Sequence, residues 1–255
     1  MHSNLTMKLT KYLFLVLAFV SVQTNLAAQS WSYSHYEIVT GLSIYHGFDD
    51  IGGSSSSNNL GGLRDFSFTN LRPGLTIGLR YKVNDRFYVK GMIASGIMYS
   101  NDKGSRNETR GYKVNIFATD IGFTAEYYFV KPAQNRYFSI MAVRGGVRPY
   151  GNPYGFYVYA GFGGAMFSPS GNAALEASPN FNGSSSFAAI FPIGVGVKVN
   201  LMPRVSFNGE FGTRFTTTDR MDGFASPYSK SNDIYYVVTF GVSYQLVQKM
   251  KFRRN

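Results

Sequence analysis

The sequence has no cysteine, a single tryptophan and few charged residues. Without cysteine there is no disulfide, no thiolate metal site, no cysteine nucleophile and no lipid-modified N-terminal cysteine. Only 15% of the residues are charged, against roughly a quarter in a soluble domain. The formal net charge is +11, but the basic residues are scattered and their longest cluster is at the end of the chain. No stripe of the kind that binds nucleic acid is therefore expected.

The chain also has no uninterrupted apolar run of the ~20 residues that a membrane-spanning helix needs. The most apolar segment, Tyr12 to Val22, follows Lys8 and Lys11 and precedes the small residues of Asn25 to Gln29. This order of basic, apolar and small residues is typical of a secretory signal peptide. We predict a signal peptide over residues 1–28, cleaved after Ala28. If the mature chain lies in a membrane, it must do so as a β-barrel.

Phenylalanine, tyrosine and glycine are abundant, with 22, 19 and 28 residues. Apolar and polar residues alternate with a period of two, most clearly where Leu75, Ile77 and Leu79 alternate with Gly78 and Arg80. Such alternation predicts strands with one apolar face. Eight segments show it, although glycines blur the facing in the fifth: 36–45, 72–82, 87–99, 117–129, 156–167, 191–199, 205–215 and 236–245.

The connections between these segments alternate in length. Short turns are predicted at Val83–Asp85 and Leu201–Pro203, and long polar loops at 49–70, 101–111, 168–186 and 219–233. Short turns on one rim and long loops on the other are typical of outer-membrane barrels. Residues 131–153 break the rule, because they fall on the short-turn side. They are either a periplasmic insert or contain a partial strand from Tyr137 to Val147, which would give an odd strand count.

We therefore predict an all-β fold, an eight-stranded antiparallel up-and-down transmembrane barrel of the outer-membrane type. The barrel covers residues 29–248, and a short basic periplasmic tail covers 249–255. Both termini are expected in the periplasm of a Gram-negative bacterium. The alternative is a soluble lipocalin-like barrel or a sandwich, which would put the apolar face inside.

Charges of both signs lie on the face opposite the apolar one. Four acids and four bases are assigned to the lumen, where they can pair, whereas packing them against a soluble core would be costly. An eight-stranded barrel is just wide enough for side chains, so we predict a plugged lumen without a useful pore. The eight residues are Glu37, Arg80, Lys90, Asp120, Glu126, Lys198, Glu210 and Arg214.

Catalytic and ligand-binding patterns are weak. His46, predicted near the outer rim, is the one rim histidine, and no serine or acid can be assigned to it as a triad. Asp219 and Asp222 share a loop, but a calcium site takes 6–8 oxygen ligands, and turn formation explains them better. We expect no catalytic residue, cofactor, metal or small-molecule substrate.

The basic tail has two interpretations. It is either a solvated end that discourages edge pairing or a contact for a periplasmic partner. Its candidate contact residues are Lys249, Lys251, Arg253 and Arg254.

In their order along the chain, several segments resemble the PorG-like outer-membrane barrels of Bacteroidota, which are associated with type IX secretion and gliding. The resemblance spans most of the mature chain, and it departs from the family at Arg220-Met221, where a Tyr-Leu pair is typical. The similar segments are Tyr36-Glu37-Ile38, Leu71-Arg72-Pro73-Gly74 with Arg80-Tyr81, Asn115-Ile116 with Glu126, Tyr159 to Gly163, Phe191 to Gly196, Arg214 with Thr218-Asp219, and Ser231-Asn232-Asp233.

This resemblance implies a non-catalytic barrel that tethers a periplasmic ring of the secretion machinery to the outer membrane. The expected partners are then outer-membrane lipid and the periplasmic ring proteins. The alternative is a stand-alone surface barrel, either an adhesin or an envelope-integrity protein, whose outer loops carry the function.

Overall fold

The computed structural model describes residues 35–48, 51, 70–103, 105, 108–132, 140–143, 146–149, 152–202, 204–224 and 232–246. The predicted signal peptide and the basic tail lie outside these residues. Within them, no helix is both long enough and apolar enough to cross a membrane.

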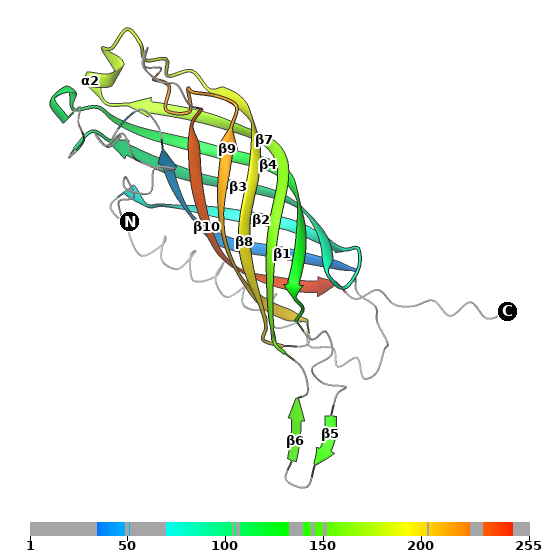
Figure 1. The fold of residues 1–255 in the computed structure, drawn as a ribbon. Coiled ribbons are helices and arrows are strands. Elements are labelled where there is room, and N and C mark those ends of the chain that lie inside the picture. The colour runs from blue at the N-terminus through cyan, green and yellow to red at the C-terminus, as the bar shows by residue number, and fades with distance from the viewer. Residues whose placement is uncertain are drawn as a thin grey trace, which may run out of the picture. The chain divides into compact units, whose positions relative to one another are not determined.

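Eight long antiparallel strands close into a barrel (Figure 1) in the order β1-β10-β9-β8-β7-β4-β3-β2. Pairing of the first and last strands completes the closure, from Tyr36 with Leu246 to Phe48 with Ile234. This confirms the predicted fold. The strands are β1 (Tyr36–Phe48), β2 (Arg72–Lys82), β3 (Phe87–Asn101), β4 (Lys113–Val130), β7 (Tyr154–Gly171), β8 (Ser186–Asn200), β9 (Val205–Thr216) and β10 (Ile234–Leu246).

The two ends of the barrel differ in their connections. At one end, the turn rim, residues 83–86 join β2 to β3 and residues 201–204 join β8 to β9. The Asn84 side chain closes the first turn, because its Oδ1 accepts hydrogen bonds from the Arg86 and Phe87 amides at 2.8 and 2.9 Å. At the other end, the loop rim, the long connections join β1 to β2, β3 to β4, β7 to β8 and β9 to β10.

The exposed outer face of the barrel is apolar and aromatic. Leu42, Phe162 and Phe187 are 67%, 65% and 73% exposed, and similar side chains cover every strand of the wall. A soluble protein rarely leaves a contiguous apolar patch of more than a few hundred Å². The outward position of the apolar side chains thus excludes the soluble alternative, in which they would fill the interior.

Aromatic side chains border this apolar belt at the turn rim. They include Tyr81, Phe87, Tyr127, Phe129 and Tyr154, all of which are at least 39% exposed. Aromatic girdles mark the membrane–water interfaces of transmembrane barrels. The turn rim is therefore where the belt meets water.

Several predicted strands were too short, among them the fourth and the sixth, which begin at Lys113 and Ser186 in the structure; the first and fifth strands show the reasons. The first strand continues past Tyr45 to Phe48, because it pairs with β10 throughout. The fifth, β7, begins at Tyr154 and ends at Gly171, because it pairs with β4 as far as Val114 with Gly171. Its last residues, Ser168-Pro169-Ser170-Gly171, have the composition of a loop. Proline is tolerated there because pairing of β7 with β8 has ended at Phe167 with Ser186, which leaves β7 as an edge strand.

The connection from β4 to β7 contains β5 (Ile140–Val143) and β6 (Gly146–Pro149). These strands pair with each other, from Ile140 with Pro149 to Val143 with Gly146, as a separate two-stranded sheet. The alternative of a partial strand added to the barrel was wrong. The insert is a hairpin, and the barrel keeps an even number of strands.

Candidate functional site

A buried arginine lies at the centre of the charged lumen. Arg80, on β2, is completely buried. Its guanidinium is 2.8 Å from Glu126 of β4, 3.2 Å from Glu37 of β1 and 3.5 Å from Glu210 of β9. It also donates to Asn208 Oδ1 at 3.2 Å and to the Tyr157 hydroxyl at 3.3 Å. One side chain thus links strands from opposite sides of the wall.

Two lysines complete this network. Lys90 Nζ lies 2.5 Å from Glu210 and 3.2 Å from Glu126, and Lys198 Nζ lies 2.5 Å from Glu37. The central network therefore holds three acids and three bases, whose side chains are at most 9% exposed. Since each charge has an ionic partner, the network avoids the uncompensated buried charge that costs several kcal/mol.

The remaining pair lies nearer the loop rim. Arg214 Nε is 3.8 Å from Asp120 Oδ2, and the Tyr235 hydroxyl donates to Asp120 Oδ1 at 2.7 Å. Arg214 also donates to the Tyr159 hydroxyl at 3.5 Å. All eight residues that sequence analysis assigned to the lumen are on inward-facing positions. Six of them contact one another in the central network, whereas Asp120 and Arg214 form a separate pair.

Tyrosine rings fill the space between the charges. Tyr88, Tyr128, Tyr157 and Tyr159 form one buried cluster, in which the Tyr128 and Tyr157 rings stack with centroids 4.6 Å apart. Inward glycines leave room for them, because a Cβ at Gly212 would clash with the Tyr159 hydroxyl. The many inward glycines are a sequence signal for such rings, but sequence analysis did not use it.

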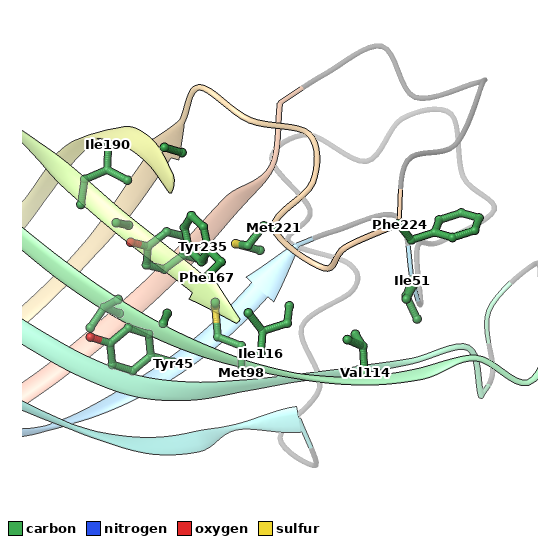
Figure 2. Packing of buried hydrophobic residues seen from close by; sticks show 14 of the residues in the cluster. Tyr45, Ile51, Met98, Val114, Ile116, Phe167, Ile190, Met221, Phe224 and Tyr235 are labelled. Carbon is green, nitrogen blue, oxygen red and sulfur yellow. The ribbon is translucent and has the colours of Figure 1, made fainter. Parts of the chain in front are cut away.

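An apolar cluster fills the lumen on the loop side (Figure 2). Barrel residues such as Met98, Ile116 and Phe167 contact each other there. Side chains from the long connections join the cluster, among them Met221 and Phe224. Sequence analysis missed this cluster, since its loop members have no periodic pattern. Its members are Tyr45, Ile51, Met98, Val114, Ile116, Ala118, Ala165, Phe167, Leu175, Ala188, Ile190, Met221, Phe224, Tyr235 and Val237.

Backbone and side-chain contacts hold the 217–224 segment over this cluster. Asp233 Oδ2 accepts the Met221 amide at 2.8 Å, and Phe224 pairs with Phe181 in an isolated antiparallel bridge. Gly223 has a φ of +74°, a conformation that other residues rarely adopt. The segment is thus folded inward.

The space left in the lumen is small. A cavity of about 10 Å³ lies beside Lys90, Met92 and Glu210, which is room for about one water molecule. Charged side chains and tyrosines fill one level of the lumen and the apolar cluster fills another. In the part of the chain that the structure describes, this arrangement fills both levels of the lumen and braces the wall.

The residues that the sequence offered as weaker candidates for catalysis or metal binding make other contacts in the structure. His46 is buried near the end of β1 with its ring 4.8 Å from that of Phe48. Asp222 Oδ1 accepts the Phe224 amide at 2.8 Å. Among the described residues, no group of three or more His, Asp or Glu side chains could hold a metal ion. The tail contacts Lys249, Lys251, Arg253 and Arg254 lie outside the described residues.

A family model for the outer membrane protein beta-barrel domain matches residues 12–245. The chain belongs to this family. The apolar belt and its aromatic girdle are therefore the membrane-facing surface of an outer-membrane protein, and the charged network is its lumen. The finer assignment to the PorG-like barrels goes beyond this match.

Several solved outer-membrane proteins have similar structures. Outer membrane protein W of E. coli is 17% identical, with a TM-score of 0.44 over 85% of this chain and 100% of that one. The attachment invasion locus protein Ail of Yersinia pestis is 12% identical, with a TM-score of 0.44 over 84% of this chain and 99% of that one. OprG of Pseudomonas aeruginosa is 12% identical, with a TM-score of 0.42 over 84% and 97%. No curated protein matches the chain.

Proposed function

We propose that this barrel is a non-enzymatic anchor that binds a periplasmic complex through its turn rim. The resemblance to PorG-like barrels makes the type IX secretion or gliding machinery the partner. In this proposal the turn rim faces the periplasm, as short turns do in barrels of this class, and both chain termini lie on that side.

The observation that carries the proposal is a difference in burial: apolar side chains of the connections are buried at the loop rim and exposed at the turn rim. At the loop rim, apolar side chains of the connections, including Met221 and Phe224, are buried in the lumen cluster. At the turn rim, Val83, Leu201 and Met202 are 52%, 54% and 63% exposed, and the 131–153 insert adds a hairpin. Apolar side chains that are exposed at a rim, beyond the membrane-facing belt, are available to anchor a partner protein.

A second candidate, a stand-alone surface barrel such as an adhesin, is favoured by the length of β4 and β7. Each has 18 residues, whereas a transmembrane strand needs roughly 9–11. Their outward side chains become polar toward the loop rim, at Lys113 and Asn115 on β4 and at Ser168 and Ser170 on β7. This part of the sheet extends beyond the apolar belt and offers a surface to an extracellular partner.

Crosslinking in intact outer membranes separates the two candidates. The tagged protein is compared with two deletions, of residues 133–152 and of residues 249–255. A control variant has the loop-rim cations Lys103, Lys113 and Arg220 replaced by glutamine. Heat-modifiable migration on gels verifies that each barrel is folded.

The anchor proposal predicts that periplasmic ring proteins are recovered with the full chain and the control, and are lost with the deletions. Recovery of the barrel alone from wild-type membranes would contradict the anchor and favour the surface barrel. As a test of the non-enzymatic assignment, the purified barrel should show no phospholipid hydrolysis above the level of its His46→Ala variant.

A further inference from the structure

Positive charge is concentrated in the segments that join strands at the turn rim and in the segment that follows the last strand in the sequence. Residues 82–86, 131–153, 201–204 and 247–255 contain eleven lysines and arginines but one acid, a net charge of 11 − 1 = +10. The rest of the chain from residue 29 has 12 basic and 13 acidic residues, a net charge of 12 − 13 = −1. The net charge of the mature sequence therefore arises entirely from these segments.

Four of these cations are within the described structure. Lys82 is 4% exposed and faces the lumen, whereas Arg86 and Lys131 are exposed and Arg204 is half-buried. We refer to Arg86, Lys131 and Arg204 as the basic collar. The acid Asp85 lies 2.8 Å from Lys82 Nζ and 3.8 Å from Lys131 Nζ. The hydrogen bond from Lys82 lowers the pKa of the Asp85 carboxyl, so this acid stays ionised at neutral pH. Because Lys82 and Asp85 neutralise each other, the three collar cations leave a net charge of 3 + 1 − 1 = +3.

One collar residue, Arg86, contacts the aromatic girdle. Arg86 is exposed, and its Nη1 donates to the hydroxyl of Tyr127 at 3.4 Å. Tyr127 is an outward residue, 40% exposed, whose ring lies 6.1 Å from that of Phe87. Tyrosines of a girdle lie at the height of the lipid headgroups. The Arg86 guanidinium is therefore on the outside of the barrel, at headgroup height.

We propose that the basic collar binds the phosphates of anionic phospholipid headgroups in the leaflet at the turn rim. A guanidinium binds phosphate with paired hydrogen bonds, and an ammonium binds it as a point charge. The contact of Arg86 with an outward girdle tyrosine favours lipid over an acidic protein surface, because it places the cation beside the membrane. This proposal does not depend on the anchor function or on its partner.

The test measures lipid selectivity with spin-labelled lipids. The full-length barrel is reconstituted in phosphatidylcholine vesicles, and the association of spin-labelled phosphatidylglycerol is compared with that of spin-labelled phosphatidylcholine. The collar variant combines Arg86→Gln, Lys131→Gln and Arg204→Gln. Its matched control replaces the three exposed loop-rim cations Lys103, Lys113 and Arg220 with glutamine, which removes the same charge from the other rim.

For wild type we expect up to a roughly fivefold preference for phosphatidylglycerol, the equivalent of the ~1 kcal/mol contributed by one cation near an anionic surface. The preference should fall in high salt, should approach one in the collar variant and should persist in the control. The salt dependence of the wild type tests the proposal even if the variant fails to fold. Absence of any preference in wild type would overturn it and leave an acidic protein as the ligand. An equal loss in the control would also overturn it.

Discussion

Replacing Arg80 with methionine should destabilise the barrel strongly. The side chain makes ion pairs with Glu37, Glu126 and Glu210 in a fully buried position. Removing one member of a buried ionic network typically costs about 3–5 kcal/mol, because the remaining charges lose compensation. Lys90 and Lys198 still contact the three acids. We therefore expect a loss near the lower end of this range, about 3 kcal/mol.

The structure also predicts a rescue. In Arg80→Met the central network holds three acids and two bases, whereas adding Glu126→Gln restores two of each. The double variant should therefore be more stable than Arg80→Met alone, with a coupling free energy of at least about 1 kcal/mol in a double-mutant cycle. Arg204→Gln, at the rim, is the control and should cost about 0.5 kcal/mol or less.

Denaturant unfolding in phospholipid vesicles measures these differences. The single tryptophan, Trp31, precedes the first strand, so the folded fraction is better followed by heat-modifiable migration and far-ultraviolet circular dichroism. Additive costs for the two substitutions, with a coupling below about 0.5 kcal/mol, would refute the argument from charge balance.

Three further predictions concern other parts of the barrel. Gly212→Ala should cost about 1–3 kcal/mol through overpacking against the Tyr159 hydroxyl, and Tyr159→Phe in the same chain should recover part of that loss in denaturant unfolding. Met221→Ala should cost about 2–5 kcal/mol, the range for truncating a buried methionine, and should speed proteolysis of the 217–224 segment; an unchanged cleavage rate would contradict the packing seen in Figure 2. Ile77→Arg, at a position 57% exposed, should cost about 2–4 kcal/mol in vesicles, whereas a neutral effect would mean that this face does not contact lipid.

The sequence predicted the strands of the barrel wall better than the contacts between side chains in the lumen. A period of two assigns every residue of a strand to one of two faces, so the apolar belt and the inward position of residues such as Arg80 and Glu210 followed from the pattern. The partner of each charge did not follow. Arg80 and Glu210 are 130 positions apart in the chain, and their contact depends on the register of all the strands between them.

The loop side was the least predictable part. Met221 and Phe224 are buried only because the β9–β10 connection folds into the lumen, a tertiary effect that leaves no local periodicity. Similarly, Pro169 indicated a loop, yet it lies within β7, because β8 no longer pairs there. Edge position and loop packing are set by neighbours distant in sequence.

The orientation of the barrel is the most direct test of the account, since both the anchor and its partner require the turn rim to face the periplasm. The chain has no cysteine, so single cysteines can be introduced at exposed positions, Met202→Cys on the turn rim and Ser184→Cys on the loop side. Intact cells are treated with a maleimide polymer too large to cross the outer membrane. The account predicts that Ser184→Cys is labelled in intact cells and that Met202→Cys is labelled only after the outer membrane is opened. Labelling of Met202→Cys in intact cells would contradict it.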